Sequence, residues 1–339
     1  MLFPVGNSPV DSLSPMSSLP KIVYFGSDAI CLPGLIYLFE AGHNLCEVVG
    51  VVTQPDRRQG RGKQLKANPV AEYARSVGMT LLQPEKPNRA LAEWMQAQSV
   101  ALAFVMAYGH FLPKSVREAP KHGMLNFHGS ILPAYRGASP VETAIAMGEK
   151  ETGVCLMQVV NEMDAGAVAD CERVSIGKKD TGPDVRARVG EAVVPLLKRT
   201  LISALEGTLS FEEQDRSRAT LTRKIFKEDG AVDFGQSAAV IDARLRALTT
   251  WPGGYFDHGE TRIKVGQCSV GESAESEVPG LVLSAGSTLD VVTGDGILQI
   301  HELQRPGGRM MPVEDFLRGY PIVAGEVLSS VKFAPLLLD

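Results

Sequence analysis

Long apolar runs and cysteines are both scarce in this sequence of 339 residues. No run approaches the ~20 consecutive apolar residues that a membrane-crossing helix requires, so a membrane protein is not expected. The five cysteines are odd in number and include no Cys-x-x-Cys pair. This usage favours reduced thiols in a cytoplasmic protein and argues against a structural metal site.

Two further absences reduce the number of possible functions. The first strand-like run is followed by Gly26-Ser27-Asp28, which does not continue as a complete Gly-x-Gly-x-x-Gly motif. A binding site for a dinucleotide is therefore not expected. The formal net charge of −5 at pH 7 means that nucleic acid could be bound only through local basic patches. Residues 1–20 are rich in Ser and Pro and lack the basic start and apolar centre of a signal peptide, so they are expected to be a disordered extension.

Patterns of strand and helix alternate through roughly the first two hundred residues. Strands are predicted at 21–25, 47–53 and 100–107, and helices at 30–41, 69–76, 90–98, 140–147 and 184–205. This alternation is typical of a doubly wound, mostly parallel sheet with helices on both faces. Ligands of such α/β folds bind beyond the carboxyl ends of the strands.

The second part of the chain has a different pattern. A polar, charged stretch at 206–220 suits a linker, and short β-rich runs separated by Gly, Ser and Pro turns recur from Ile263 onward. Such short runs are typical of a small barrel. We therefore predict a disordered extension (1–20), a catalytic domain (21–205), a linker (206–220), a barrel domain (221–330) and a tail (331–339).

The segment from Met124 to Gly137 carries the strongest chemical signal. Its strand-like start places Asn126 and His128 two residues apart, and residues i and i+2 of a strand point to the same face. An amide can stabilise an oxyanion while an imidazole transfers the proton, which is what acyl transfer requires. Asp164, after the apolar run 153–160, could accept a hydrogen bond from the imidazole and fix its tautomer.

Asn126, His128 and Asp164, with the loop Ser130-Ile131-Leu132-Pro133 between them, resemble the active site of the 10-formyltetrahydrofolate-dependent formyltransferases. Ile131 stands where that family has Leu, a swap of similar volume. The resemblance implies a Rossmann-like domain, 10-formyltetrahydrofolate as formyl donor and co-substrate, and no metal. It also implies that Asn126, His128 and Asp164 are catalytic, and that the folate lies near Tyr108, Gly109, Ser130, Ile131, Leu132 and Pro133.

The C-terminal part decides between members of that family. Thr222–Gly230, Arg246-Ala247-Leu248, Trp251-Pro252-Gly253 and Gln304–Arg309 resemble the open, oligonucleotide-binding-like barrel of the methionyl-tRNA formyltransferases. The resemblance implies formyl transfer from the folate to the α-amino group of initiator methionyl-tRNA, for translation initiation, by a monomeric cytoplasmic enzyme.

A basic loop at 54–66 supports this assignment. It carries five cationic residues, with Asp56 as its only acid, and such loops bind phosphates or unpaired nucleic-acid ends. In the family a matching loop enters the acceptor stem of the tRNA, although Arg58 and Gln64 stand where many relatives have Pro and Lys. The implied tRNA-binding residues are Arg57, Arg58, Arg61 and Lys63.

Two alternatives remain open from the sequence. A related enzyme could formylate a small amine, either a glycinamide nucleotide or an amino sugar nucleotide, but the basic loop and the barrel favour a tRNA. A folate- or tRNA-binding protein without turnover is the second alternative. The complete Asn126, His128 and Asp164 set argues against it, because a binder gains nothing from a buried titratable pair.

Overall fold

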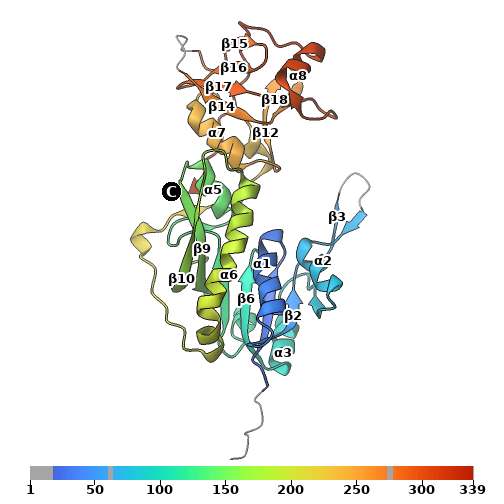
Figure 1. Ribbon diagram of the computed structural model, residues 1–339, viewed down its shortest axis with the longest axis vertical. Coiled ribbons are helices and arrows are strands. Elements are labelled where there is room, and N and C mark those ends of the chain that lie inside the picture. Colours follow the sequence, from blue (N-terminus) through green and yellow to red (C-terminus); the bar gives the residue numbers. More distant parts are fainter. Residues whose placement is uncertain (1–17, 60–63, 273–277, 339) are drawn as a thin grey trace, which may run out of the picture.

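The computed structural model describes residues 18–59, 64–272 and 278–338 and consists of a large α/β domain and a smaller β-rich domain stacked along the long axis (Figure 1). The predicted fold class is confirmed. Most of the predicted extension, residues 1–17, lies outside the described residues. No helix in the described part of the chain is long and apolar enough to cross a membrane.

The large domain is built on a seven-stranded sheet with the order β10-β9-β7-β6-β1-β2-β5. Strands β5, β2, β1, β6 and β7 pair in parallel, whereas β9 is antiparallel to β7 and β10 to β9. The strands are β1 (Lys21–Gly26), β2 (Glu47–Val52), β5 (Leu81–Leu82), β6 (Val100–Met106), β7 (Met124–His128), β9 (Glu151–Gln158) and β10 (Val168–Ser175).

Helices cover both faces of this sheet. They are α1 (Leu32–Ile36), α2 (Pro69–Ser76), α3 (Arg89–Ala97), α4 (Lys114–Arg117), α5 (Pro140–Ala146) and α6 (Gly182–Glu206). The predicted helix 30–41 is divided into a 3-10 turn (Ala29–Cys31), α1 and a π-helical turn (Tyr37–Ala41). Pro33 in the first turn of α1 has no N–H to donate, and Gly42 directly follows the π-helical turn.

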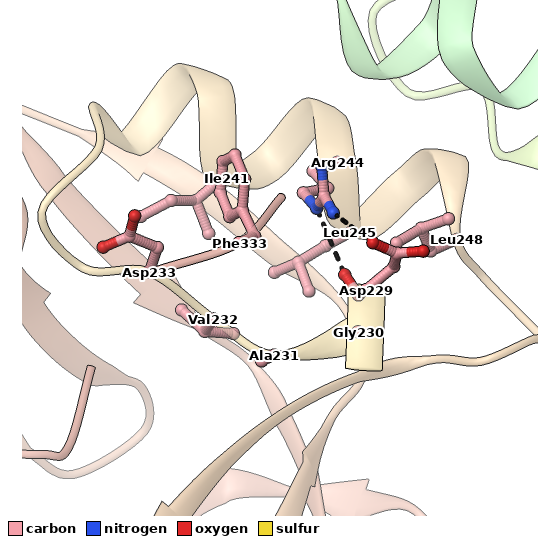
Figure 2. A pocket seen from close by; sticks show the side chains of 10 residues that line it. All are labelled: Asp229, Gly230, Ala231, Val232, Asp233, Ile241, Arg244, Leu245, Leu248 and Phe333. Atoms are coloured by element: carbon pink, nitrogen blue, oxygen red, sulfur yellow. Dashed lines mark hydrogen bonds and ion pairs between the residues drawn. The ribbon is translucent and has the colours of Figure 1, made fainter. Parts of the chain in front are cut away.

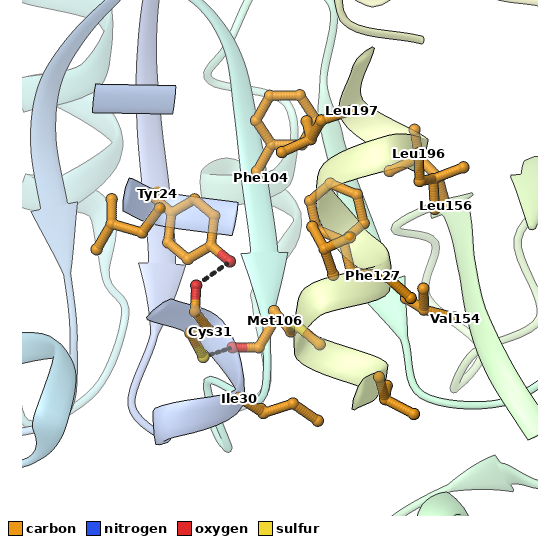
Figure 3. Packing of buried hydrophobic residues seen from close by; sticks show 14 of the residues in the cluster. Tyr24, Ile30, Cys31, Phe104, Met106, Phe127, Val154, Leu156, Leu196 and Leu197 are labelled. Carbon is orange, nitrogen blue, oxygen red and sulfur yellow. Dashed lines mark hydrogen bonds between the residues drawn. The ribbon is translucent and has the colours of Figure 1, made fainter. Parts of the chain in front are cut away.

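Alternate residues of the strands enter two separate cores. On β1, Ile22 and Tyr24 pack in the cluster that includes α1 and α6, whereas Val23 and Phe25 pack in the cluster that includes α3. Figure 3 shows the first cluster, in which the Tyr24 hydroxyl donates to the Cys31 carbonyl at 3.1 Å. This alternation follows from the period of two of a strand, and it gives the sheet an apolar core on each face.

The polar stretch that follows α6 runs along the large domain (Figure 1). Glu212 exchanges two backbone hydrogen bonds with Val168 at the start of β10. Further along, β11 (Leu221–Thr222) pairs in parallel with β8 (Arg136–Gly137) and antiparallel with β20 (Leu337–Leu338). We call residues 212–222 the crossing segment. Although a linker was predicted here, both of its ends pair with strands of the catalytic domain.

The smaller domain contains two four-stranded antiparallel sheets, β12-β13-β18-β19 and β14-β17-β16-β15, around one apolar core. These strands are β12 (Gly254–His258), β13 (Thr261–Val265), β14 (Cys268–Gly271), β15 (Val282–Ala285), β16 (Leu289–Val292), β17 (Ile297–Ile300), β18 (Glu302–Gln304) and β19 (Met311–Pro312). Helices α7 (Ala238–Ala247) and α8 (Val313–Gly319) complete it. The residues at the end of α7, Ala247 and Leu248, join the core of the large domain.

A buried ion cluster stabilises the start of the small domain. Asp229 accepts hydrogen bonds from the Phe226 amide and from the guanidinium group of Arg223. It also accepts one from the guanidinium group of Arg244, as Figure 2 shows. The Arg244 guanidinium also lies 4.0 Å from the centre of the Phe333 ring. Burial would raise the pKa of Asp229, but these hydrogen bonds and the two positive charges outweigh burial and lower it. The cluster therefore keeps a buried carboxylate ionised.

One prediction about the cysteines is wrong. Cys155 and Cys171 form a disulfide, while Cys31, Cys46 and Cys268 are free thiols. The two bonded residues lie directly opposite each other on the antiparallel strands β9 and β10, with their Cα atoms 4.1 Å apart. Sequence reasoning missed the pair because it depends on strand register, whereas the sequence shows only two cysteines 16 residues apart.

Candidate active site

Strand β7 presents Asn126 and His128 to the same side of the sheet. Leu125 and Phe127 belong to the core under α6, so the two polar side chains face the opposite side. Burial differs between them: His128 is almost completely buried, whereas Asn126 is partly exposed. The pair lies at the carboxyl end of β7, which is parallel to β6, as expected for a ligand site in an α/β fold.

The imidazole of His128 is held from both sides. Its Nε2 lies 2.8 Å from the carbonyl oxygen of Tyr135, and since a carbonyl can only accept, Nε2 carries a hydrogen. Its Nδ1 lies 3.5 Å from Oδ2 of Asp164. The sequence pattern predicted that Asp164 would accept from the imidazole and fix its tautomer. The structure places the Asp164 carboxylate at Nδ1 and the Tyr135 carbonyl at Nε2, so an acceptor faces each ring nitrogen.

Asp164 is in an unusual backbone conformation in the loop between β9 and β10. Its φ is +48°, in the left-handed region that costs most residues about 1–3 kcal/mol and is least unfavourable for Asn and Asp. The carboxylate Oδ2 accepts a hydrogen bond from the backbone N–H of Gly137 at 2.9 Å. The loop that follows His128 therefore contacts both the imidazole and the carboxylate.

The predicted folate loop is compact and largely apolar. Ser130 is fully buried, and its hydroxyl donates to the Ala134 carbonyl at 2.6 Å, so it holds the loop rather than facing a ligand. Leu132 packs with Cys155, Met157 and the partly buried Ile131. Pro133 is partly buried, and the Leu132–Pro133 peptide bond is cis. The disulfide thus lies directly against this loop.

Just after β6, the side chain and the backbone of Tyr108 have different surroundings. The Tyr108 ring is buried and packs edge-on against Phe25 at 5.4 Å, and burial raises the pKa of its hydroxyl to about 12. The Tyr108 carbonyl already accepts hydrogen bonds from Gln54 and Ser27. The ring and the carbonyl of Tyr108 are thus both engaged by contacts within the protein. Gly109, with φ +78°, is exposed.

Arg57 and Arg58, two of the predicted tRNA-binding residues, belong to a hairpin that extends from the large domain (Figure 1). Its strands are β3 (Arg57–Gln59) and β4 (Gln64–Lys66). The exposed guanidinium of Arg57 lies 3.4 Å from the Glu85 carboxylate, and Arg58 follows on the same strand. Arg61 and Lys63, which were also predicted to bind tRNA, lie outside the described residues.

Several residues that shape the site were not predicted. Thr220 accepts a hydrogen bond from the Tyr135 amide at 2.8 Å through its hydroxyl. The Thr222 hydroxyl donates to the Arg136 carbonyl at 3.1 Å. Gln214 donates to the carbonyl of Asp164. Gln214 and Thr220 lie in the stretch that was predicted to be a linker, and Thr222 lies at the start of the predicted barrel domain. Backbone pairing with β8 and β10 brings them to the site.

Comparison with known proteins places the chain in a family. Residues 21–201 match the family described as formyl transferase, and residues 224–321 match the formyl transferase C-terminal domain. The chain therefore belongs to the formyl transferase family. The two matched regions correspond to the two domains of the structure, and they flank the crossing segment.

The relatives define the group within this family. The chain is 38% identical over 312 residues to a methionyl-tRNA formyltransferase of Sorangium cellulosum, covering 91% of this chain and 99% of the relative. It is 34% identical over 310 residues to one of Sulfurihydrogenibium, covering 90% and 99%. The resemblance stated from the sequence is confirmed at the level of these enzymes.

Solved structures share the fold at lower identity. An N-formyltransferase of Helicobacter canadensis, solved with folinic acid and dTDP-3-aminofucose, has a TM-score of 0.63 at 17% identity and covers 85% of this chain and 99% of its own. A methionyl-tRNA formyltransferase of Clostridium thermocellum has a TM-score of 0.54 at 15% identity, covering 74% and 93%. At these identities the likeness shows the fold alone.

Proposed function

We propose that Asn126, His128 and Asp164 carry out the formyl transfer to methionyl-tRNA that the relatives of this chain perform. The transfer itself follows from full-length similarity at 34–38% identity to methionyl-tRNA formyltransferases. The observation that supports the residue roles is the pairing of the buried His128 with Asp164 at 3.5 Å, on the face of β7 that also carries Asn126.

The formyl donor is proposed to be 10-formyltetrahydrofolate, acting as a co-substrate. The apolar surface of Ile131, Leu132 and Pro133 suits one face of a flat pterin ring, and the backbone N–H of Tyr108 and Gly109 at the neighbouring strand end suit its polar edge. When bound, the folate supplies an activated formyl carbon. Among the described residues, no group of three or more His, Cys, Asp or Glu could hold a metal ion.

The proposed chemistry is direct transfer to the amine. An α-amino group has a reference pKa of about 7.7–8.0, so much of it is neutral and nucleophilic near neutral pH. The amide of Asn126 donates to the formyl oxygen as that oxygen gains negative charge. A well-placed donor of this kind contributes about 3–4 kcal/mol to transition-state stabilisation.

His128 is proposed to transfer the proton from the incoming amine toward the departing folate nitrogen. Because Nε2 already donates to the Tyr135 carbonyl, the proton is taken up at Nδ1, beside Asp164. The resulting imidazolium has an acceptor at each nitrogen, which stabilises it. Positioned general acid–base catalysis of this type contributes about 10²–10⁴-fold to the rate.

The tRNA is proposed to bind the hairpin and the small domain. The hairpin offers Arg57 and Arg58, with Arg61 and Lys63 in its sequence, and cationic side chains at such sites bind phosphates. A small amine would require neither the hairpin nor a second domain. The relatives that cover nearly the whole chain also favour the tRNA.

One assay tests substrate and chemistry together. Purified protein is given formyl-folate with a labelled formyl group and, separately, charged initiator tRNA, charged elongator tRNA or glycinamide ribonucleotide. We expect label on methionyl initiator tRNA only. Transfer to glycinamide ribonucleotide would contradict the tRNA assignment, and no transfer to any acceptor would contradict the proposed chemistry.

A further inference from the structure

We propose that Gln214, in the crossing segment, is a positioning residue for formyl transfer: its side-chain amide joins the two loops that hold the His128 imidazole. One loop follows β7 and supplies the Tyr135 carbonyl to Nε2. The other lies between β9 and β10 and supplies the Asp164 carboxylate to Nδ1. The proposal rests on the assignment of His128 and Asp164 as the pair that transfers the proton.

The amide of Gln214 makes three hydrogen bonds. Its Nε2 donates to the Asp164 carbonyl at 2.9 Å and to the Gly166 carbonyl at 2.7 Å. Its Oε1 accepts from Nε of Arg136 at 2.9 Å. Two carbonyl acceptors on one side and a guanidinium donor on the other fix which end of the amide faces which loop. A single side chain therefore connects one loop to the other.

The position of Gln214 is itself fixed by the backbone on both sides. Two residues earlier, Glu212 pairs with Val168 at 2.8 Å in each direction. Further on, the Thr220 carbonyl accepts from the Arg136 amide at 2.8 Å. The amide is thus presented by a segment that is hydrogen-bonded to the large domain on both sides of Gln214, which suits a positioning role.

The contacts of Gln214 bear directly on the backbone of Asp164. This residue has a φ of +48°, a conformation that persists only where the surroundings impose it. Its carbonyl is held by Gln214, and its carboxylate by the Gly137 amide. Without the Gln214 amide, two carbonyls lose their donor and the buried Arg136 loses an acceptor, so the loop can relax and withdraw the carboxylate from His128.

The first test separates turnover from binding. In Gln214→Ala the kcat is expected to fall about 10–10²-fold, because displacement of a reacting group by about 1 Å can cost 10²-fold. KM for formyl-folate and for methionyl-tRNA should stay within about threefold, since the amide is not placed to touch either substrate. Gln214→Glu should show the same fall in kcat. Its carboxylate can still accept from Arg136, but it has no N–H to donate to the carbonyl oxygens of Asp164 and Gly166.

Asp215→Ala is the matched control. Asp215 is the next residue in the chain and is exposed, and its carboxylate accepts hydrogen bonds from the amide and the hydroxyl of Ser217 in its own turn. It should leave kcat unchanged. Normal kcat in Gln214→Ala, or a rise in KM without a fall in kcat, would overturn the proposal.

A double-mutant cycle excludes a merely structural role. If Gln214 acts through Asp164, adding Gln214→Ala to Asp164→Ala should lower kcat by less than about twofold. If the two residues act independently, the fold losses of kcat in the single variants should multiply in the double variant. Multiplicative losses would overturn the proposal, and Gln214→Glu replaces Gln214→Ala in the cycle if the alanine variant does not fold. If Asp164→Ala alone keeps normal turnover, the proposed catalytic roles fail. A strongly impaired Asp164→Ala beside a normal Gln214→Ala overturns only the positioning role.

Discussion

The surroundings of His128 and the basic hairpin differ in how firmly their side chains are held. The His128 side chain is 6% exposed, and protein atoms lie against both of its ring nitrogens. The hairpin consists of two three-residue strands, and every residue of β4 is exposed. Chemistry requires groups held within a fraction of an ångström, whereas capture of a large polyanion requires reach and charge. Under the proposed function, these two demands fall on different parts of the molecule.

The largest effect is expected at the proton-transferring pair. His128→Ala and Asp164→Ala should each lower kcat about 10²–10⁴-fold, with KM little changed, because the groups act in the transition state. Asn126→Ala should lower kcat to a similar extent through loss of the oxyanion donor. Steady-state kinetics with both substrates measure this.

The control for that prediction is His43→Ala. His43 is an exposed histidine whose Nδ1 lies 2.7 Å from the Glu40 carbonyl oxygen, so its replacement should leave kcat unchanged. Near-normal turnover in His128→Ala would show that a fixed, buried imidazole is not what the reaction uses.

The next largest effect is expected in the stability of the small domain. Asp229→Ala leaves the buried Arg244 without its carboxylate, and breaking a buried pair in this way costs about 3–5 kcal/mol. The matched control is Asp257→Ala, which breaks the exposed pair with Arg262 and should cost about 0–1 kcal/mol. Urea unfolding measures both. Equal losses in the free energy of unfolding would mean that burial does not determine how much these ion pairs contribute to stability.

The lowered pKa of Asp229 predicts how the stability of the protein depends on pH. The folded-state pKa of Asp229 is lower than its usual value, so its contribution to stability is complete above the unfolded pKa of about 3.9 and is lost as the pH falls through the folded value. Below about pH 4 the native chain should lose stability more steeply with falling pH than Asp229→Ala. Urea midpoints at a series of pH values test this.

A smaller effect is expected from one methyl group in the loop after His128. Gly137 has φ +99°, and a Cβ there would lie 2.4 Å from the Thr222 carbonyl oxygen. Gly137→Ala should therefore push the loop away from Asp164 and lower kcat about tenfold or more. In Gly148→Ala the φ of +76° is equally unfavourable, but the Cβ meets nothing within 4 Å.

The two glycine variants separate backbone strain from displacement of the loop. Both should lose about 1–2 kcal/mol of stability through the positive φ, and only Gly137→Ala should lose turnover. Loss of kcat in Gly148→Ala as well would show that general destabilisation, not the position of the loop, controls activity.

Much of the fold follows from local pattern. The predicted helix 69–76 agrees with α2, and the strand 100–107 agrees with β6 (Val100–Met106) within one residue. Apolar periodicity and end signals such as Asn68, which caps α2, are local and can be read from the chain. The parallel sheet then follows from the alternation of strands and helices.

The parts that escaped prediction depend on contacts between distant residues. The Cys155–Cys171 disulfide requires the register of β9 and β10. The bond from Gln214 to the Asp164 carbonyl spans 50 positions and joins a stretch that shows no strand pattern of its own. The tautomer of His128 depends on a backbone carbonyl, which carries no sequence signal. The sequence motif named His128 and Asp164, which lie 3.5 Å apart in the structure, but it did not indicate the contacts that hold them.

The smallest effect is expected at the hairpin. If Arg61 and Lys63 neutralise phosphates, replacing both by Ala should reduce the slope of log affinity against log salt by about 0.7–0.9 for each phosphate that is no longer neutralised. Folate affinity should stay the same, because the hairpin follows β2 and not β7. Replacing Lys178 and Lys179, two exposed lysines between β10 and α6, provides a control of equal charge. Binding of methionyl-tRNA measured from low to moderate salt gives the slopes. Both double variants remove two positive charges, so their slopes should differ only if Arg61 and Lys63 contact phosphates and displace counterions there. Equal slopes would therefore exclude the hairpin from the tRNA interface and leave the small domain as the proposed docking surface.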